Sequence, residues 1–301
     1  IGHDDRHPDG GVILAHACCV LFLADGGCCC KFCSATAAGR GTALPRQMPT
    51  PKPSRMNMLG LFSRTHDASA KFPEGRVGFA IGDVHGRADL LEKLLARLEA
   101  QAGADTREGV APVVVFLGDY VDRGPDSRGV IDLILSGRPL GYDRRFLRGN
   151  HEQAMMAFAA APLENRAWLL QGGAETLMSY GVKPPSPLNA TEADWVQAAA
   201  DLNSALPAEH RVFFEGLERY VEMGDYAFVH AGIDAARSLE DQTDDDLYWS
   251  RQRFLNSKRR FSHRVVHGHT PVATPYADAR RVGVDTGAYA SGTLTAARFE
   301  G

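Results

Sequence analysis

Five segments of this chain bring glycine together with aspartate, asparagine or histidine in a way that could support chemistry. The five segments are Gly82-Asp83-Val84-His85-Gly86, Gly118-Asp119-Tyr120-Val121-Asp122-Arg123-Gly124, Arg148-Gly149-Asn150-His151-Glu152, His230-Ala231-Gly232 and Gly268-His269-Thr270. Oxygen and imidazole ligands of this kind suit Mn²⁺, Fe or Zn²⁺ better than copper or an iron-sulfur cluster. Glycine also lets the backbone pass close to an ion, because it has no Cβ. A single Asp-x-His segment is common in ordinary turns, but five glycine-flanked segments together predict a metal site.

A continuous apolar run over 113–117, typical of a buried parallel strand, precedes the second of these segments. Residues 77–81 and 145–147 repeat this arrangement before the first and third segments. Asp83 and His85 are two residues apart, so in an extended strand end their side chains would point to the same side. Ligands in open α/β sheets bind beyond the carboxyl ends of the strands. We therefore expect the three segments to meet at one edge of a sheet.

Two helices are predicted between these strands. Leucines recur through 89–101 at the spacing of one helical face, and 127–136 has a similar apolar face that ends before Gly137 and Pro139. The resulting β-α-β-α-β order, with short links, implies parallel neighbouring strands joined by right-handed crossovers.

The chain from 152 to about 224 has a helical pattern. We predict one helix over 168–180, and Thr191 with Asp194 forms a capping box that opens another helix. Strands are predicted again at 226–230, 264–266, 281–284 and 292–299. The expected fold class is therefore α/β, with two packed, mainly mixed β-sheets flanked by helices in an α/β/β/α sandwich. The helical stretch would be an insert beside the site.

The composition limits the classes of function. The chain has 301 residues, 44% of them hydrophobic, which is enough to bury a core. Its formal net charge of -4 and the lack of a strongly basic segment disfavour nucleic-acid binding. All six cysteines lie within the first 33 residues, so the rest of the chain has no disulfide frame, zinc thiolate or cysteine nucleophile. We expect a cytoplasmic protein that binds neither nucleic acid nor membranes, in an oligomeric state that the sequence does not indicate.

Residues 1–55 allow three interpretations. The apolar run over 12–24 could belong to a secretory signal, but the acidic residues before it disfavour that role. A cysteine metal cluster is the second, although three consecutive cysteines cannot easily bind one ion. We favour the third, a tail or over-extended start before Met56 and Met58. The predicted organisation is a disordered tail over 1–75 and one domain over 76–300, with the helical insert at about 152–224.

In their order along the chain, the five segments resemble the signature of the metal-dependent phosphoprotein phosphatases, within the calcineurin-like metallophosphoesterases. The resemblance covers about 76–300 and is strongest to the bacterial and phage serine/threonine protein phosphatases, whereas nothing in 1–75 matches. It implies a catalytic domain with two divalent metal ions, Mn²⁺ first and Fe or Zn²⁺ as alternatives. The metal ligands that it implies, with Asp119 shared by both ions, are Asp83, His85, Asp119, Asn150, His230 and His269.

The same resemblance implies the other roles. His151 would be the general acid, Asp122 the carboxylate that orients it, and Arg123 and Arg251 the ligands of the substrate phosphate. The residues alone leave alternatives open, since His151 could cap a helix and the arginines could form surface salt bridges. Two metal ions would lower the pKa of a bridging water, and the hydroxide would attack phosphorus in line. No phosphorylated enzyme intermediate would then form.

The function implied is hydrolysis of phosphate monoesters, and we expect a serine/threonine protein phosphatase that acts on phosphorylated proteins or peptides. A symmetrical dinucleoside tetraphosphate hydrolase is the first rival, because it would share all five segments. The segment from Gly172 to Gly181 resembles the bacterial protein phosphatases more, and this resemblance favours the protein phosphatase. A metal-holding adaptor without activity is the second rival, and the presence of His151 with every predicted ligand disfavours it.

Overall fold

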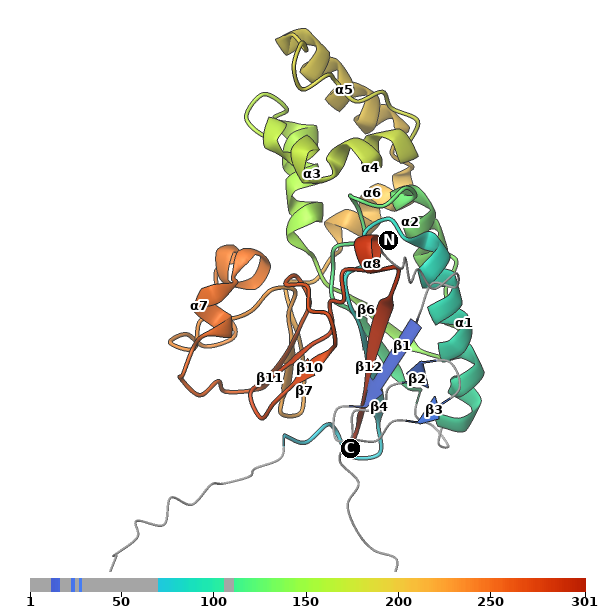
Figure 1. Ribbon diagram of the computed structural model, residues 1–301, viewed down its shortest axis with the longest axis vertical. Helices are drawn as coiled ribbons and strands as arrows, with labels where there is room; N and C mark the ends of the chain where they lie inside the picture. The colour runs from blue at the N-terminus through green and yellow to red at the C-terminus, as the bar shows by residue number, and fades with distance from the viewer. Residues whose placement is uncertain (1–11, 17–22, 25–26, 29–69, 106–110) are drawn as a thin grey trace, which may run out of the picture.

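Two five-stranded β-sheets pack face to face and carry helices on their outer faces, as Figure 1 shows. The computed structural model describes residues 12–16, 23–24, 27–28, 70–105 and 111–301. The strand order is β1-β12-β4-β5-β6 in the first sheet and β10-β11-β9-β8-β7 in the second. The expected α/β/β/α sandwich is confirmed.

The first sheet contains the predicted β-α-β-α-β unit. Strands β4 (Val77–Ile81), β5 (Val113–Phe116) and β6 (Asp143–Phe146) are parallel neighbours. Helices α1 (Ala88–Asp105) and α2 (Ser127–Leu135) connect them. Strand β12 (Leu294–Glu300), which follows the short helix α8 (Ala288–Ser291), lies antiparallel to β4 and makes the sheet mixed.

The first 75 residues include strands that we did not predict. Strand β1 (Val12–His16) pairs parallel with β12, while β2 (Leu23–Ala24) and β3 (Gly27–Cys28) form a two-stranded sheet. Residues 29–69 lie outside the described residues. The choice among tail, signal and cysteine cluster therefore stays open.

Side chains of the first sheet alternate between two cores. In β4, Phe79 and Ile81 pack on the helix side, whereas Ala80 packs between the two sheets. The helix-side core also contains five leucines of α1, all fully buried: Leu90, Leu91, Leu94, Leu95 and Leu98. Because β4 and β5 are covered on both faces, their sequences are continuous apolar runs, whereas β6 has the sequence Asp-Arg-Arg-Phe and is only partly buried.

The second sheet is also mixed. Its strands are β7 (Val221–Met223), β8 (Tyr226–Phe228), β9 (Arg264–His267), β10 (Tyr276–Ala277) and β11 (Arg281–Gly283). The central three are parallel to one another, and the edge strands β7 and β10, which we did not predict, are antiparallel to their neighbours. The π-helical turn η2 (Asp245–Trp249) and helix α7 (Gln252–Leu255) cover its outer face, where Tyr248 and Phe254 pack in one cluster with Val265.

The part of the chain between β6 and β7 is helical, as predicted, and projects from one end of the sandwich (Figure 1). Its helices are α3 (Asn150–Ala160), η1 (Arg166–Gln171), α4 (Gly173–Ser179), α5 (Glu192–Ala205) and α6 (Ala208–Glu215). The capping box of Thr191 and Asp194 is confirmed at the start of α5. Among the described residues, no helix is both long and apolar enough to cross a membrane.

The prediction of one continuous helix over 168–180 was wrong. Gly172 adopts a left-handed conformation with φ of 110°, which ends η1 and starts α4. A Cβ at this position would lie 2.5 Å from the backbone nitrogen of Arg123. The helix therefore breaks where the insert meets the loop that follows β5.

Candidate active site

The five glycine-flanked segments come together at one end of the two sheets. They follow β4, β5, β6, β8 and β9, and loops after neighbouring parallel strands converge. The six predicted metal ligands and the predicted general acid are at most 4% exposed: Asp83, His85, Asp119, Asn150, His151, His230 and His269. The two sheets thus bring together, in a buried cluster, polar residues that are far apart in the sequence.

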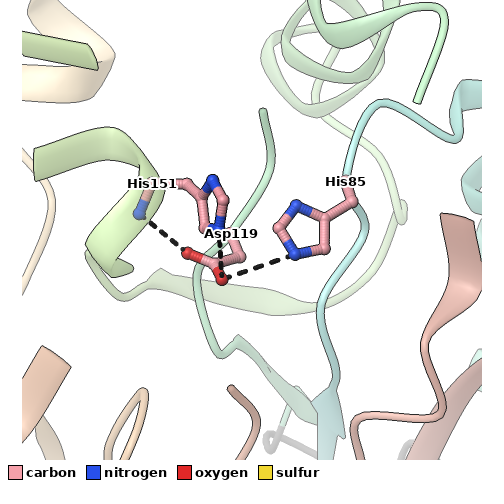
Figure 2. A group of neighbouring side chains, drawn as sticks. All are labelled: His85, Asp119 and His151. Atoms are coloured by element: carbon pink, nitrogen blue, oxygen red, sulfur yellow. Dashed lines mark hydrogen bonds and ion pairs between the residues drawn. The ribbon is translucent and has the colours of Figure 1, made fainter. Parts of the chain in front are cut away.

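Asp119 lies at the centre of this cluster. Its Oδ2 is 3.5 Å from His85 Nε2, 3.4 Å from His230 Nε2 and 4.0 Å from His151 Nε2. Figure 2 shows His85 and His151 turned towards this carboxylate from different segments, and the Asp119 Oδ1 also accepts the backbone N–H of His151 at 3.1 Å. One carboxylate therefore contacts both halves of the cluster.

Asn150 joins the half of the cluster that lies toward the second sheet. Its Oδ1 is 2.9 Å from His230 Nε2 and 2.8 Å from His269 Nδ1. The potential ligand atoms form two groups, one of His85, Asp119 and His151 and the other of Asp119, His230 and His269, and within each group they lie within 4.8 Å of one another. The two groups share Asp119.

The ring orientations suit metal binding. The Nδ1 atoms of His85 and His230 lie 2.8 Å from the carbonyl oxygens of Val121 and Leu117, which can only accept. Neutral rings would thus donate from Nδ1 and turn the lone pair of Nε2 towards Asp119, and such second contacts orient metal-binding histidines. The Nε2 lone pairs would then face the Asp119 carboxylate at 3.5 and 3.4 Å, and they would repel its negative charge. A cation bound between the rings and the carboxylate would remove that repulsion, so these residues fit divalent cations.

The pKa shifts distinguish rings that are kept neutral from rings whose charge is favoured. Burial lowers the pKa of His85 to about 3 and that of His269 to about 2. Burial also opposes charge on His230, but Asp119 outweighs it and raises the pKa of this ring. Burial would raise the pKa of Asp119, yet His230 and His151 hold it well below its usual range. His85 and His269 are thus kept neutral, whereas Asp119 is kept ionised beside His230 and His151.

Asp83 lies outside both groups of closely spaced atoms. Both its carboxylate oxygens accept the backbone N–H of His269, at 3.1 and 3.0 Å. Burial, with the negative charges of Asp285 and Asp119, raises its pKa well above the usual value. Strand β4 ends at Ile81 and His85 has φ of 46°, so the expected extended strand end is wrong. The metal-binding role of Asp83 stays a prediction.

Glu152 holds the loop that carries Asp119, a role that we did not predict. Its two buried oxygens accept four backbone N–H groups, from Gly149 at 2.9 Å, Asp119 at 3.0 Å, Tyr120 at 2.8 Å and Val121 at 3.2 Å. Burial, with the nearby charge of Asp119, raises its pKa to about 7. Its place three residues after the N-cap Gly149 of α3 was the available signal, because an acidic side chain there commonly bonds backbone N–H groups.

His151 and Asp122 form the predicted pair. Nδ1 of His151 is 2.6 Å from Oδ2 of Asp122, and both side chains are buried. Burial alone would lower the pKa of His151, but Asp119 and Asp122 raise it. Because Nδ1 is occupied by Asp122, Nε2 is the ring atom that faces the Asp119 carboxylate and the site.

The two predicted phosphate ligands lie beside different histidines. Arg123 NH2 is 3.1 Å from His151 Nε2, and its guanidinium lies 4.8 Å from the ring centre of Tyr289. Arg251 Nε donates to His269 Nε2 at 3.1 Å, from an exposed position just before α7. The structure therefore brings both arginines to the cluster.

Comparisons with known proteins identify the family of this chain. The calcineurin-like phosphoesterase family matches residues 79–298. Serine/threonine-protein phosphatase 1 of Salmonella typhimurium is 30% identical over 74% of this chain and 91% of that protein. An asymmetrical bis(5'-nucleosyl)-tetraphosphatase of Geobacillus thermodenitrificans is 27% identical over 73% of this chain and 89% of that protein. A solved cold-active protein tyrosine phosphatase is 15% identical, with a TM-score of 0.45 over 76% of this chain and 77% of that chain. This chain belongs to the calcineurin-like phosphoesterase family and is a metallophosphoesterase, a hydrolase that uses divalent metals.

Proposed function

We propose that this protein hydrolyses phosphate monoesters, and that phosphoserine and phosphothreonine in proteins or peptides are its substrates. The observation that carries the proposal is the Asp119 carboxylate, which belongs to both groups of potential metal ligands. The 30% identity to a bacterial serine/threonine protein phosphatase supports the choice of substrate. The sequence-based expectations of a cytoplasmic location and of no nucleic-acid or membrane partner stay predictions.

The metal-binding part of the proposal uses the six predicted ligands. His85 and Asp119, with Asp83, would hold one ion, and Asp119, Asn150, His230 and His269 the other. Mn²⁺ is our first choice, with Fe or Zn²⁺ as alternatives, because all donors are oxygen or imidazole nitrogen. When bound, two such ions activate a water and neutralise the charge of the phosphate.

The chain's own residues would bind the phosphate and move the proton. Arg123 and Arg251 would donate to phosphate oxygens, since guanidinium groups match them in pairs. His151 would give a proton from Nε2 to the departing oxygen, while Asp122 keeps the ring oriented through Nδ1. Water would attack phosphorus directly, so we propose no phosphorylated enzyme intermediate.

Hydrolysis of dinucleoside tetraphosphates is the second candidate. The observation that favours it is the 27% identity to a tetraphosphatase named as asymmetrical. The rival that we considered from the sequence was the symmetrical reaction, which divides diadenosine tetraphosphate into two molecules of ADP. Asymmetrical cleavage would instead give ATP and AMP.

A substrate panel with the Mn²⁺-loaded protein tests the proposal. The panel compares p-nitrophenyl phosphate, a phosphoserine peptide, a phosphothreonine peptide and diadenosine tetraphosphate by kcat/KM. We expect turnover of p-nitrophenyl phosphate and a preference for the phosphopeptides. A preference for diadenosine tetraphosphate would reject the protein phosphatase, and its products would show which cleavage occurs. Metal binding without turnover of any substrate would favour the adaptor.

A further inference from the structure

The Asp122 carboxylate is held by two side chains of the helical insert. Its Oδ2 accepts from Trp168 Nε1 at 2.8 Å, besides its contact with His151, and its Oδ1 accepts from Thr176 Oγ1 at 2.6 Å. Trp168 belongs to η1 and Thr176 to α4. Three donors from three separate elements thus fix both oxygens of a carboxylate that is fully buried.

The insert also holds the backbone beside this carboxylate. Asp122 and Arg123 have φ of 73° and 69°, a left-handed conformation that is unfavourable for residues other than glycine. The N–H of Asp122 donates to Thr176 Oγ1 at 2.8 Å, and the N–H of Arg123 donates to the carbonyl of Gly172 at 3.1 Å. Thr176 thus holds the backbone of Asp122, whereas the carbonyl of Gly172 holds that of Arg123, so a change of the Thr176 side chain leaves the Arg123 contact in place.

Both side chains are themselves held in place. Trp168 is 2% exposed, its ring centre lies 4.9 Å from that of Phe158, and a Cβ on Gly173 would lie 2.5 Å from its ring. Thr176 is fully buried, and its hydroxyl also contacts Ser127 Oγ at 3.0 Å. Neither side chain has room to follow a carboxylate that rotates away. Since the terminal torsion of aspartate is intrinsically soft, these fixed donors determine the plane of the Asp122 carboxylate.

We propose that Trp168 and Thr176 are positioning residues, which hold the Asp122 carboxylate towards His151 Nδ1 and so aim His151 Nε2 at the leaving oxygen. The inference rests on the proposed function, because it concerns the delivery of the proton in that reaction. The two side chains touch neither the predicted metal ligands nor the phosphate ligands through a side-chain hydrogen bond. Their loss should therefore affect proton delivery and leave metal binding intact.

The test compares substrates that differ in their need for a proton. Phenyl phosphate and a phosphoserine peptide have basic leaving groups and need the acid, whereas p-nitrophenyl phosphate has a weakly basic leaving group and needs it little. We expect Trp168→Phe and Thr176→Val to lower kcat by about tenfold or more for the first two substrates and by less than about threefold for p-nitrophenyl phosphate. KM and bound Mn²⁺ should stay unchanged. Thr176→Ser keeps the hydroxyl and should restore the rates.

Trp195→Phe is the matched control. Trp195 is also a buried tryptophan of the helical insert with a ring contact to Phe158, but it lies on α5, apart from Asp122. Its variant should keep the wild-type dependence on the leaving group, and melting curves of all variants report folding. Equal losses for all substrates, or failure of Thr176→Ser to restore the rates, would overturn the positioning role. If the wild type hydrolyses none of the esters, both the proposed function and the positioning role are overturned. If the wild type is active and the variants are unaffected, only the positioning role is overturned.

Discussion

Backbone strain in this protein is concentrated at the residues that we expect to do chemistry. Within the described part of the chain, five residues other than glycine have positive φ, and all are predicted site residues: His85, Asp119, Asp122, Arg123 and His269. Each such conformation costs on the order of 1–3 kcal/mol and persists only where the surroundings enforce it. Glu152 and Thr176 supply that enforcement, because they bond the N–H groups of Asp119 and Asp122. Residues that only support the site are thus as necessary as those that line it.

Replacing His151 by asparagine tests its role as the acid. Asparagine can still fill the buried space but cannot deliver a proton, so we expect kcat for phosphopeptides to fall by about 10²- to 10⁴-fold. Metal content, measured on the purified variant, should equal that of the wild type if Asn150 and the other predicted ligands suffice. Unchanged turnover would remove His151 from the mechanism.

Glu152→Gln should destabilise the Asp119 loop. Each Glu152 oxygen accepts two backbone N–H groups. In glutamine one of these oxygens is replaced by an NH₂ group, which cannot accept, so two backbone N–H groups would lose their acceptor. Buried donors left without acceptors cost about 1–3 kcal/mol of unfolding free energy. Urea titration of the metal-free protein measures this loss. Glu164→Gln, which changes an exposed carboxylate, is the control and should alter stability little.

At the scale of elements, the site depends on how the helical insert meets the loop after β5. Gly172 separates η1 from α4, and Trp168 and Thr176 reach Asp122 from either side of it. The carbonyl of Gly172 accepts the N–H of Arg123. Without the insert, the Asp122 carboxylate would lose the hydrogen bonds from Trp168 and Thr176. The sheets therefore place the predicted metal ligands, and the insert would complete the predicted proton-donating pair.

Gly172→Ala tests this junction. The added methyl group would lie 2.5 Å from the backbone nitrogen of Arg123, and the left-handed φ costs a further 1–2 kcal/mol, roughly, for a residue with a Cβ. Gly181→Ala is a matched control, because Gly181 has φ of 78° in the same insert but no atom within 4 Å of the added Cβ. We expect a loss of unfolding free energy in both variants and a fall in kcat/KM only in Gly172→Ala. Equal activity in the two would show that the junction does not affect the site.

At the scale of the whole molecule, the sequence allowed the inner strands of the two sheets and the position of the site to be predicted, because both follow from local patterns, whereas the edge strands β1, β7 and β10 were not predicted. Apolar runs precede the glycine-flanked Asp83 and Asp119, Phe146 and Leu147 precede Gly149-Asn150, and parallel topology brings such strand ends together. The contacts of Trp168 and Thr176 with Asp122 join residues 46 and 54 positions apart and have no local signal. The assignment of individual roles came from the family resemblance, which the family match over 79–298 supports.

Removal of metal should lower the unfolding free energy of the whole domain, because the predicted metal ligands follow strands of both sheets. The buried carboxylates of Asp83 and Asp119 repel one another, and bound cations would offset that repulsion. A ligand that binds only the folded state at a hundredfold excess over its Kd adds about 2.7 kcal/mol of unfolding free energy per site. We therefore expect chelation to lower Tm and added Mn²⁺ to restore it.

Asp119→Asn should remove most of this response, since the one carboxylate shared by both groups of ligands would be lost. Asp245→Asn, which changes an exposed carboxylate outside both groups, should respond to Mn²⁺ as the wild type does. Scanning calorimetry with and without chelator measures each Tm, and metal analysis of the same samples gives the number of ions bound. A wild-type Tm that is indifferent to both chelator and Mn²⁺, or an Asp119→Asn protein that still binds two ions, would contradict a shared metal pair at this end of the sheets.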